Sequence, residues 1–332
     1  MRTKSRLLST AGTLVGLAIL VALPWFFRSA YDIVLLNTAL MFCIVVLGLN
    51  FIYGFAGIFS LAQAAFWGIG AYTSALLTVD YKAPVWVGLI AAGIVACLFG
   101  LVIGVPTLKL KTHYLTLATL GFAEAVRMVI MNFDKLTHGA QGIRNIPAPS
   151  FGPLAIDSPY KFYYLNLAVV ALVVIFGIRL LSSRIGRALA ATRDDELAAR
   201  SSGVDVTYTR VLAFAISAFW AGIAGSLWAH FFGYISPETF DLSAIIRFTS
   251  MLVIGGAGTI AGPIVGSVLL TYLPEWLKFL ESYYMAIYGL SLVVFLVFAP
   301  KGLVGLVSSL WIQLPRSGRR SLADGGKKVT DS

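Results

Sequence analysis

The sequence predicts an all-α protein that crosses a membrane many times as a helical bundle. Of its 332 residues, 58% are hydrophobic and only 12% are charged, whereas soluble domains are usually about 45–50% apolar and about 25% charged. The mean hydropathy is +0.86. The chain also contains repeated apolar runs of the length that a membrane-spanning helix needs, about 20 residues, with no persistent strand alternation. Lipid must therefore cover much of the surface.

The apolar runs give nine candidate spans in chain order. They cover residues 7–27, 31–53, 57–79, 84–106, 113–131, 160–181, 209–233, 244–274 and 283–300. The first run is long for the core of a signal peptide and lacks small residues at its end, which favours an uncleaved first span over a cleaved leader. We expect one membrane domain over residues 1–311 and a disordered, basic tail over 312–332.

Lysine and arginine residues indicate the orientation of these spans. Arg2, Lys4 and Arg6 place the N-terminus in the cytoplasm, because basic residues flank spans on that side. Six crossings then put the hydrophilic connection 182–208 inside and the connection 132–159 outside. The basic tail also belongs in the cytoplasm, so 244–274 must cross twice, giving about ten crossings. The net charge of +10 follows this pattern and does not indicate a nucleic-acid partner.

Two clusters of glycine interrupt the apolar pattern, one in each half of the chain. The first contains Gly54 and Gly57, and the second contains Gly255, Gly256 and Gly258. Broken helices persist in a membrane only where the freed backbone is buried in protein or lines a cavity. Paired interruptions are typical of a translocation pathway, whereas the alternative is that small residues only allow close helix packing. Both interpretations stay open at this stage.

Polar residues inside the spans are further candidates for the pathway. They are Ser60, Gln63, Thr116 and Thr119. Alternatively, these side chains only form hydrogen bonds between helices. Glu124 and Arg127 are three residues apart, so they can pair on one helix face, either lining an entrance or only neutralising each other.

The remaining titratable residues predict neither a metal site nor a disulfide. His113, His138 and His230 are far apart in the sequence, and Cys43 and Cys97 lie within apolar runs. We expect His230 and Asp241 at the membrane interface. The glycines and prolines of the connection 132–159 predict an ordered, turn-rich platform.

Residues 183–203, SRIGRALAATRDDELAARSSG, form a dense patch with four arginines and three acids. Its alanines and leucines favour a short helix, and Gly203 is a natural helix end. Such a helix is too polar to enter the bilayer. We therefore expect it to dock a partner on the cytoplasmic side, mainly through Leu189 and Leu197, with Arg184, Arg187 and Arg193 pairing with acids of that partner. The alternative is a plain basic loop that only fixes topology.

The patch also carries a family resemblance. Glu196, Ala198, Ala199 and Gly203 have the Glu-x-Ala-Ala-x-x-x-Gly spacing by which ABC importer permeases engage their ATPase. Residues 183–229 resemble the signature stretch of branched-chain amino-acid ABC transporter permeases, of the larger of the two membrane subunits. Residues 47–77, 108–147 and 235–267 resemble further blocks of that family. The sequence departs from the family pattern at Thr112-His113 and at Arg247.

The resemblance implies roles and partners. It assigns ATPase coupling to Arg184, Gly186, Arg187, Arg193, Glu196, Ala198, Ala199 and Gly203. It implies a second homologous permease, two cytoplasmic ATPase subunits and a periplasmic substrate-binding protein, in a bacterial inner membrane. ATP and magnesium would bind the ATPase subunits and not this chain, which contains no G-x-x-x-x-G-K-[ST] phosphate loop.

The expected function is that of a permease subunit, not an enzyme. The substrates implied by the resemblance are branched-chain or related hydrophobic amino acids. Urea or short amides carried by the same architecture are one alternative. An ion-coupled carrier or channel is a more distant one, because no span carries the series of acids or histidines expected of an ion relay.

Overall fold

The computed structural model describes residues 29–107, 112–151 and 154–277, together with residues 24, 289 and 302–305. Long helices dominate this part of the chain, which confirms the all-α class. They are α2 (Ala30–Asn50), α3 (Gln63–Val79), α4 (Val85–Thr107), α5 (Thr112–Asn132), α7 (Pro159–Ser182), α10 (Val206–Phe232), α11 (Leu242–Gly255) and α12 (Ala261–Leu277). Shorter helices are η1 (Phe51–Phe55, a π-helix), α6 (Asp134–Thr137), η2 (Gly139–Gln141), α8 (Arg184–Asp194), α9 (Glu196–Ser201) and η3 (Pro237–Phe240).

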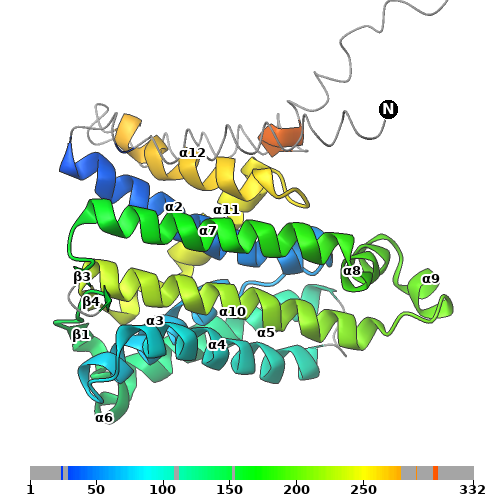
Figure 1. Ribbon diagram of the computed structural model, residues 1–332. Coiled ribbons are helices and arrows are strands. Elements are labelled where there is room, and N and C mark those ends of the chain that lie inside the picture. Colours follow the sequence, from blue (N-terminus) through cyan, green and yellow to red (C-terminus); the bar gives the residue numbers. More distant parts are fainter. Residues whose placement is uncertain are drawn as a thin grey trace, which may run out of the picture.

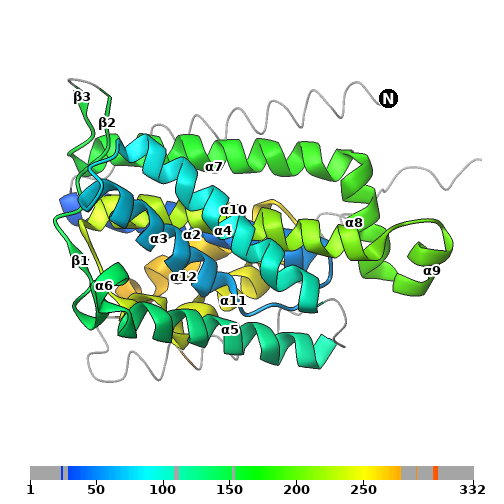
Figure 2. The ribbon, with the colours of Figure 1, turned by 90° about the horizontal axis from the view of Figure 1, so that it is seen from below.

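The long helices run roughly side by side and leave the short elements at the two ends of the bundle (Figure 1). Helix α10 packs on α3 and α4, and α2 lies among α7, α10, α11 and α12. Seen from below, α5 lies along one side of the bundle and α7 along the other (Figure 2). α6 and the strands gather at one end, whereas α8 and α9 project from the other.

Small residues and aromatic rings hold the centre of the bundle together. A Cβ atom on Gly70 would collide with the backbone of Gly222, so α3 and α10 touch there through their main chains. Trp67 packs edge-on against Phe240 with ring centroids 4.7 Å apart. Since lipid tails are as apolar as these side chains, such close packing stabilises the bundle more than burial itself does.

Among the described residues, five helical segments are long and apolar enough to span a membrane. They are Ala30–Phe55, Val85–Pro106, Tyr114–Asn132, Pro159–Ser182 and Val206–Phe232. Each matches an expected span to within three residues. The expected span 57–79 begins later, at Gln63, because Gly57 has a φ of +71° that ends the preceding helical path and leaves 56–62 irregular.

The stretch 244–274 forms two helices, α11 and α12, that pack against each other, as the charge pattern required. The candidate spans 7–27 and 283–300 lie outside the described residues, apart from residues 24 and 289, and so does the tail 312–332. The total of ten crossings and the domain boundary at residue 311 therefore stay predictions.

The connection 132–159 is an ordered platform, as expected. Its strand β1 (Ile143–Arg144) pairs antiparallel with β4 (Tyr234–Ile235), which follows α10. Strands β2 (Ser150–Phe151) and β3 (Leu154–Ala155) pair antiparallel with each other. The β1–β4 pair joins the platform to the end of the bundle, so the segment does not behave as a free linker.

His230 contributes to this attachment, and its expected position at the membrane interface stays a prediction. The side chain is only 3% exposed. Its Nδ1–H donates to the carbonyl of Pro147 at 2.7 Å, so Nε2 accepts from Ser74 Oγ at 2.8 Å. The imidazole is buried because it satisfies polar groups of two other segments, α3 and the platform.

Candidate functional site: the coupling junction

The charged patch is helical, but it forms two helices where a single one was expected. Ser183 caps α8 by accepting from Gly186 N at 3.2 Å. Asp195 then adopts an extended conformation and ends that helix. Its carboxylate accepts from Leu197 N at 2.8 Å and Ala198 N at 3.0 Å, which starts α9. Aspartate favours this N-cap position over a helix interior, and the acids in mid-segment therefore divide the patch.

Glu196 holds α9 against the rest of the chain. One carboxylate oxygen accepts from Arg200 at 2.7 Å within α9, and the other accepts from Arg210 of α10 at 2.6 Å. Gly203 then turns the chain toward α10 with a φ of +81°, a conformation that favours glycine. α9 is thereby held at a defined angle and does not hang from a loose loop.

The two leucines expected to dock a partner have different surroundings. Leu197 is 77% exposed on α9, whereas Leu189 is fully buried within the chain. The expectation for Leu189 is wrong, because α8 lies with this face against α7 and α10. The side chains of Arg184 and Arg187 are exposed, as are those of Ala198 and Leu197, while Ala199 is buried. A Cβ on Gly186 would collide with the backbone at Leu180, so this glycine allows the tight turn from α7 to α8.

Arg193 contacts the bundle of its own chain while its side chain stays 42% exposed, so its expected pairing with a partner stays a prediction. Its Nη1 donates to the carbonyl oxygen of Gly54 at 3.0 Å, and its Nη2 lies 3.2 Å from Asp194 Oδ1. Its aliphatic stem covers Gly57, where an added Cβ would lie 2.6 Å from Arg193 Cγ. Gly54 lies in the last turn of the helical segment that ends at Phe55, where carbonyl groups lack a partner within the helix. The guanidinium supplies a donor for this carbonyl.

Asn50 joins this contact to the second glycine cluster. The side chain is fully buried at the end of α2. Its Oδ1 accepts from Gly258 N at 2.9 Å, and its Nδ2 donates to the carbonyl of Thr259 at 2.8 Å. The two glycine interruptions, far apart in the sequence, are therefore adjacent. We call the group Arg193, Gly54, Gly57, Asn50 and Gly258 the coupling junction.

The other glycines of the second cluster shape the hairpin itself. A Cβ on Gly255 would collide with the backbone of Gly262, so α11 and α12 touch there. Gly256 has a φ of +118° and reverses the chain. For Gly255 the structure favours the close-packing alternative.

Comparison with known proteins identifies the family. A family model described as "Branched-chain amino acid transport system / permease component" matches residues 33–296. The chain belongs to this permease family. The permease is thus a transporter subunit and a multi-pass membrane protein, in agreement with the five apolar segments of membrane-spanning length in the described part of the chain.

Several curated proteins are similar to the permease over most of its length. LivM of Salmonella typhimurium, a high-affinity branched-chain amino acid transport system permease protein, is 34% identical over 86% of this chain and 73% of its own length. LivM of Escherichia coli K12 is 35% identical over 88% and 74%. LivH of Salmonella typhimurium, a permease protein of the same kind of system, is 26% identical over 80% and 91%. No solved structure matches the permease significantly.

Thr116 and Thr119 of this permease fix the irregular segment 56–62 to α5. Thr116 Oγ1 donates to the carbonyl of Phe59 at 3.2 Å, and Thr119 Oγ1 accepts from Leu61 N at 3.0 Å. Both threonines thus satisfy backbone groups that lie outside any helix. These contacts favour the hydrogen-bonding alternative over a pathway lining.

Ser60 and Gln63 are also engaged in hydrogen bonds. Ser60 is buried, and its Oγ accepts from Ala62 N at 3.3 Å. Gln63 Nε2 donates to the carbonyl of Val45 at 2.8 Å, and its Oε1 accepts from Ser217 Oγ at 2.9 Å. Gln63 therefore joins α3 to α2 and α10. Neither residue belongs to the coupling junction.

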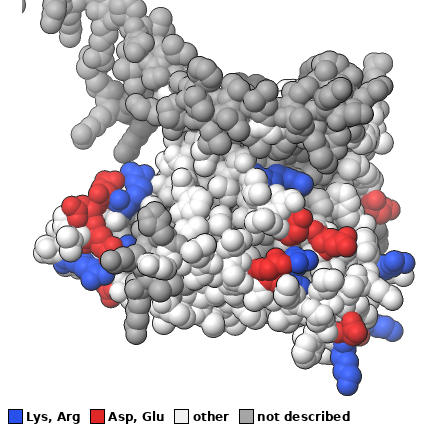
Figure 3. Space-filling model, turned by 180° about the vertical axis from the view of Figure 1, so that it is seen from behind, with Lys and Arg blue, Asp and Glu red and all other residues white. Residues whose placement is uncertain are grey.

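Glu124 and Arg127 pair on α5, as their spacing predicted. Arg127 Nε lies 3.0 Å from both carboxylate oxygens of Glu124, and the Glu124 side chain is 42% exposed. Glu238 and Asp241, in and after η3, also interact electrostatically with Arg127. In Figure 3, acidic and basic side chains form several groups toward the two ends of one side of the molecule. The pair therefore lies apart from the coupling junction, on the surface of this chain.

Asn50 and Thr259 are the members of this region that sequence reasoning missed. Both stand beside the glycine clusters, and Asn50 directly precedes the first one in an otherwise apolar run. A buried amide in a spanning helix requires a polar partner, and this signal could have marked Asn50. Within the described ranges, no group of three histidine, cysteine, aspartate or glutamate residues could hold a metal ion.

Proposed function

We propose that the permease imports branched-chain or related hydrophobic amino acids as part of an ATP-driven complex. The names of its LivM and LivH relatives support this class of substrate over urea or short amides. In this proposal α8 and α9 face the cytoplasm with both chain termini, and the platform 132–159 faces a periplasmic binding protein. ATP hydrolysis takes place on two partner ATPase subunits.

The coupling junction carries the proposal. Arg193 belongs to α8, which is part of the projecting end of the chain, and its guanidinium is hydrogen-bonded to the broken segment η1. Asn50 extends the contact to the turn between α11 and α12. A displacement of α8 therefore acts directly on the two interrupted helices, beside residues 56–62 and 256–260, which lie outside regular helix. An importer whose ATP is hydrolysed on separate cytoplasmic subunits requires such a contact between its cytoplasmic helices and its membrane helices.

The projecting helix α9 supplies the surface on which the ATPase subunits would act. Exposed ion pairs formed by Arg184 or Arg187 would contribute only about 0–1 kcal/mol each. Leu197, which is 77% exposed, would contribute more if buried, about 1.5–3 kcal/mol. We infer that Leu197 is the main docking contact and that the arginines orient it.

A second permease subunit would cover the exposed face of α5. Leu117 and Met128 are exposed there, and the Glu124–Arg127 pair lies on the same helix within the candidate span. An unpaired charge at the bilayer centre costs about 2.5–3.5 kcal/mol on insertion scales. Pairing between Glu124 and Arg127 reduces this cost. Contact with a second subunit, or with an aqueous pathway between the two subunits, reduces it further than contact with lipid would. The similarity to both LivM and LivH supports two homologous membrane subunits.

Reconstitution into vesicles tests the function. The permease, its second membrane subunit, the ATPase subunits and the binding protein should give ATP-dependent uptake of labelled leucine, isoleucine or valine, with urea as the alternative substrate. Uptake of urea alone would contradict the proposed substrate class. Uptake that follows an ion gradient and needs no ATP would contradict the proposed mechanism.

Variants of α9 test the coupling role in the same vesicles. Glu196→Gln removes the ion pairs to Arg200 and Arg210, and Gly203→Leu forces a side chain into a left-handed conformation that costs about 1–2 kcal/mol. Both should lower transport per ATP hydrolysed while the protein still inserts and assembles. Ser202→Ala, an exposed neighbour, is the matched control. Normal transport by Gly203→Leu would refute the coupling role of this turn.

A further inference from the structure

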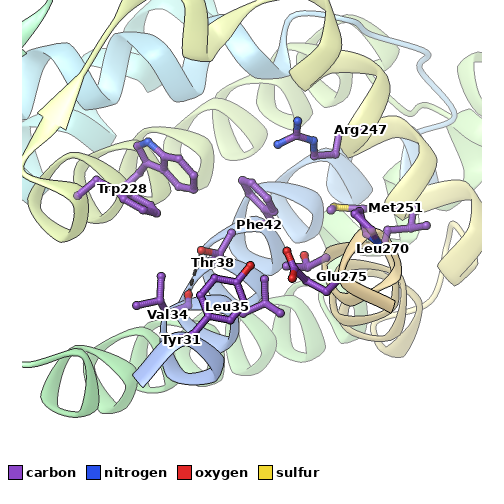
Figure 4. A pocket seen from close by; sticks show the side chains of 13 residues that line it. Tyr31, Val34, Leu35, Thr38, Phe42, Trp228, Arg247, Met251, Leu270 and Glu275 are labelled. Atoms are coloured by element: carbon purple, nitrogen blue, oxygen red, sulfur yellow. Dashed lines mark hydrogen bonds between the residues drawn. The ribbon is translucent and has the colours of Figure 1, made fainter. Parts of the chain in front are cut away.

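A cavity of about 500 Å³ opens between α2, α10, α11 and α12, away from the coupling junction. It lies toward the platform end of the bundle, because it is lined by the first half of α2, the last turns of α10, the second half of α12 and the middle of α11. Figure 4 shows the side chains from these helices around one space. The volume falls within the range of small-molecule sites, about 300–1,000 Å³.

Among the described residues, the lining is mainly apolar and has two charged groups, Arg247 and Glu275. Phe42, Trp228, Met251 and Leu270 present aromatic and aliphatic surfaces to the cavity, and Phe42 stacks on Trp228 with ring centroids 5.4 Å apart. Arg247 of α11 points into the same space, with its guanidinium carbon 5.6 Å from the centre of the Phe42 ring (Figure 4). A pocket of this composition matches a ligand with an apolar body and an anionic group.

Arg247 has no ion pair with any carboxylate among the described residues. The nearest acid on its own element, Asp241, caps α11 by accepting from Ala244 N at 3.1 Å and from Ser243 Oγ at 2.9 Å. An arginine within a membrane domain is costly, and such residues usually face a cavity or mark a substrate path. The guanidinium therefore retains donors directed toward a ligand.

We propose that this cavity holds an apolar α-amino acid during translocation, with its carboxylate on Arg247 and its side chain against Phe42 and Trp228. The inference rests on the proposed function and adds a site within the permease itself. The site lies near the platform, so an amino acid released by a binding protein would meet it early in the path.

Direct binding to the assembled complex tests this site. Labelled leucine is titrated against the purified permease with its second membrane subunit and ATPase subunits, without binding protein, and compared with leucinol, which lacks the carboxylate. Because the leucine carboxylate would form a hydrogen-bonded ionic contact with Arg247, Arg247→Gln should weaken leucine binding by about 10- to 100-fold. Binding of leucinol, which cannot form this contact, should stay unchanged. Arg247→Lys should restore part of the leucine affinity. Arg179→Gln, which removes an exposed arginine from α7, should bind leucine as the wild type does.

Three results would overturn the inference. One is equal binding of leucine and leucinol by the wild type, which decides the matter even if Arg247→Gln does not assemble. Another is unchanged leucine binding in Arg247→Gln. The third is a phospholipid that co-purifies with the wild type and is lost in Arg247→Gln while leucine binding stays the same. In all three cases the wild type would still take up leucine into vesicles when ATP is hydrolysed. Absence of this uptake in the wild type would instead refute the proposed function.

Discussion

Removing the guanidinium of Arg193 should disconnect the projecting helices from the broken segments of the bundle. Its Nη1 donates to the carbonyl of Gly54 at 3.0 Å across 139 residues of sequence. A hydrogen bond from a charged donor contributes about 1.5–3 kcal/mol. Arg193→Ala should therefore weaken the linked arrangement by about 10- to 100-fold, because each 1.4 kcal/mol is a factor of ten.

The assay is the ratio of leucine imported to ATP hydrolysed by the reconstituted importer. We expect ATP hydrolysis to continue in Arg193→Ala while this ratio falls by about tenfold or more. Arg179→Ala is the matched control, because Arg179 of α7 is exposed, has the same charge and belongs neither to the coupling junction nor to α8 and α9. A wild-type ratio in Arg193→Ala would refute the role of the coupling junction.

A double-mutant cycle with Gly57 isolates the contact. An alanine at this position would place its Cβ 2.6 Å from Arg193 Cγ and would hold a φ of +71°. Gly57→Ala alone should lower the transport ratio through both the clash and the strain. Arg193→Ala removes the clashing atom, so the double variant should lose less than the sum of the two single effects. Strict additivity would show that the two residues act independently.

Three further predictions concern the packing and the orientation. Gly222→Leu should destabilise the detergent-solubilised protein by about 1–3 kcal/mol or more, because the glycine touches the backbone of α4. Gly121→Leu, which has open space around it, should not destabilise the protein. Equal melting temperatures of the two variants would contradict this prediction. His230→Ala should destabilise the protein and so lower its melting temperature, because Ser74 Oγ and the Pro147 carbonyl lose their partner, at a cost of about 1–3 kcal/mol each. An unchanged melting temperature would mean that water replaces the imidazole. In a variant without native cysteines, Leu197→Cys should react with a membrane-impermeant thiol reagent only from the inside and Arg144→Cys only from the outside, and the opposite labelling would reverse the proposed topology.

Properties that depend on neighbouring residues could be predicted from the sequence. Apolar runs of membrane-spanning length gave the helices to within a few residues, because a bilayer requires continuous apolar surface. The parity of basic residues required a hairpin over 244–274, and the glycines between α11 and α12 provide its turn. The helical character of the charged patch and the Glu124–Arg127 pair also follow from local spacing.

Other properties depended on contacts between distant segments. The partner of Arg193 is a carbonyl 139 residues away, and Asn50 meets Gly258 across 208 residues. The burial of Leu189 and His230 depends on how α8 and α10 pack. Composition and spacing determined which segments enter the membrane, since hydropathy is a property of each run alone. Only the tertiary structure decided which polar groups meet, because a buried donor takes whichever acceptor the packing brings within reach.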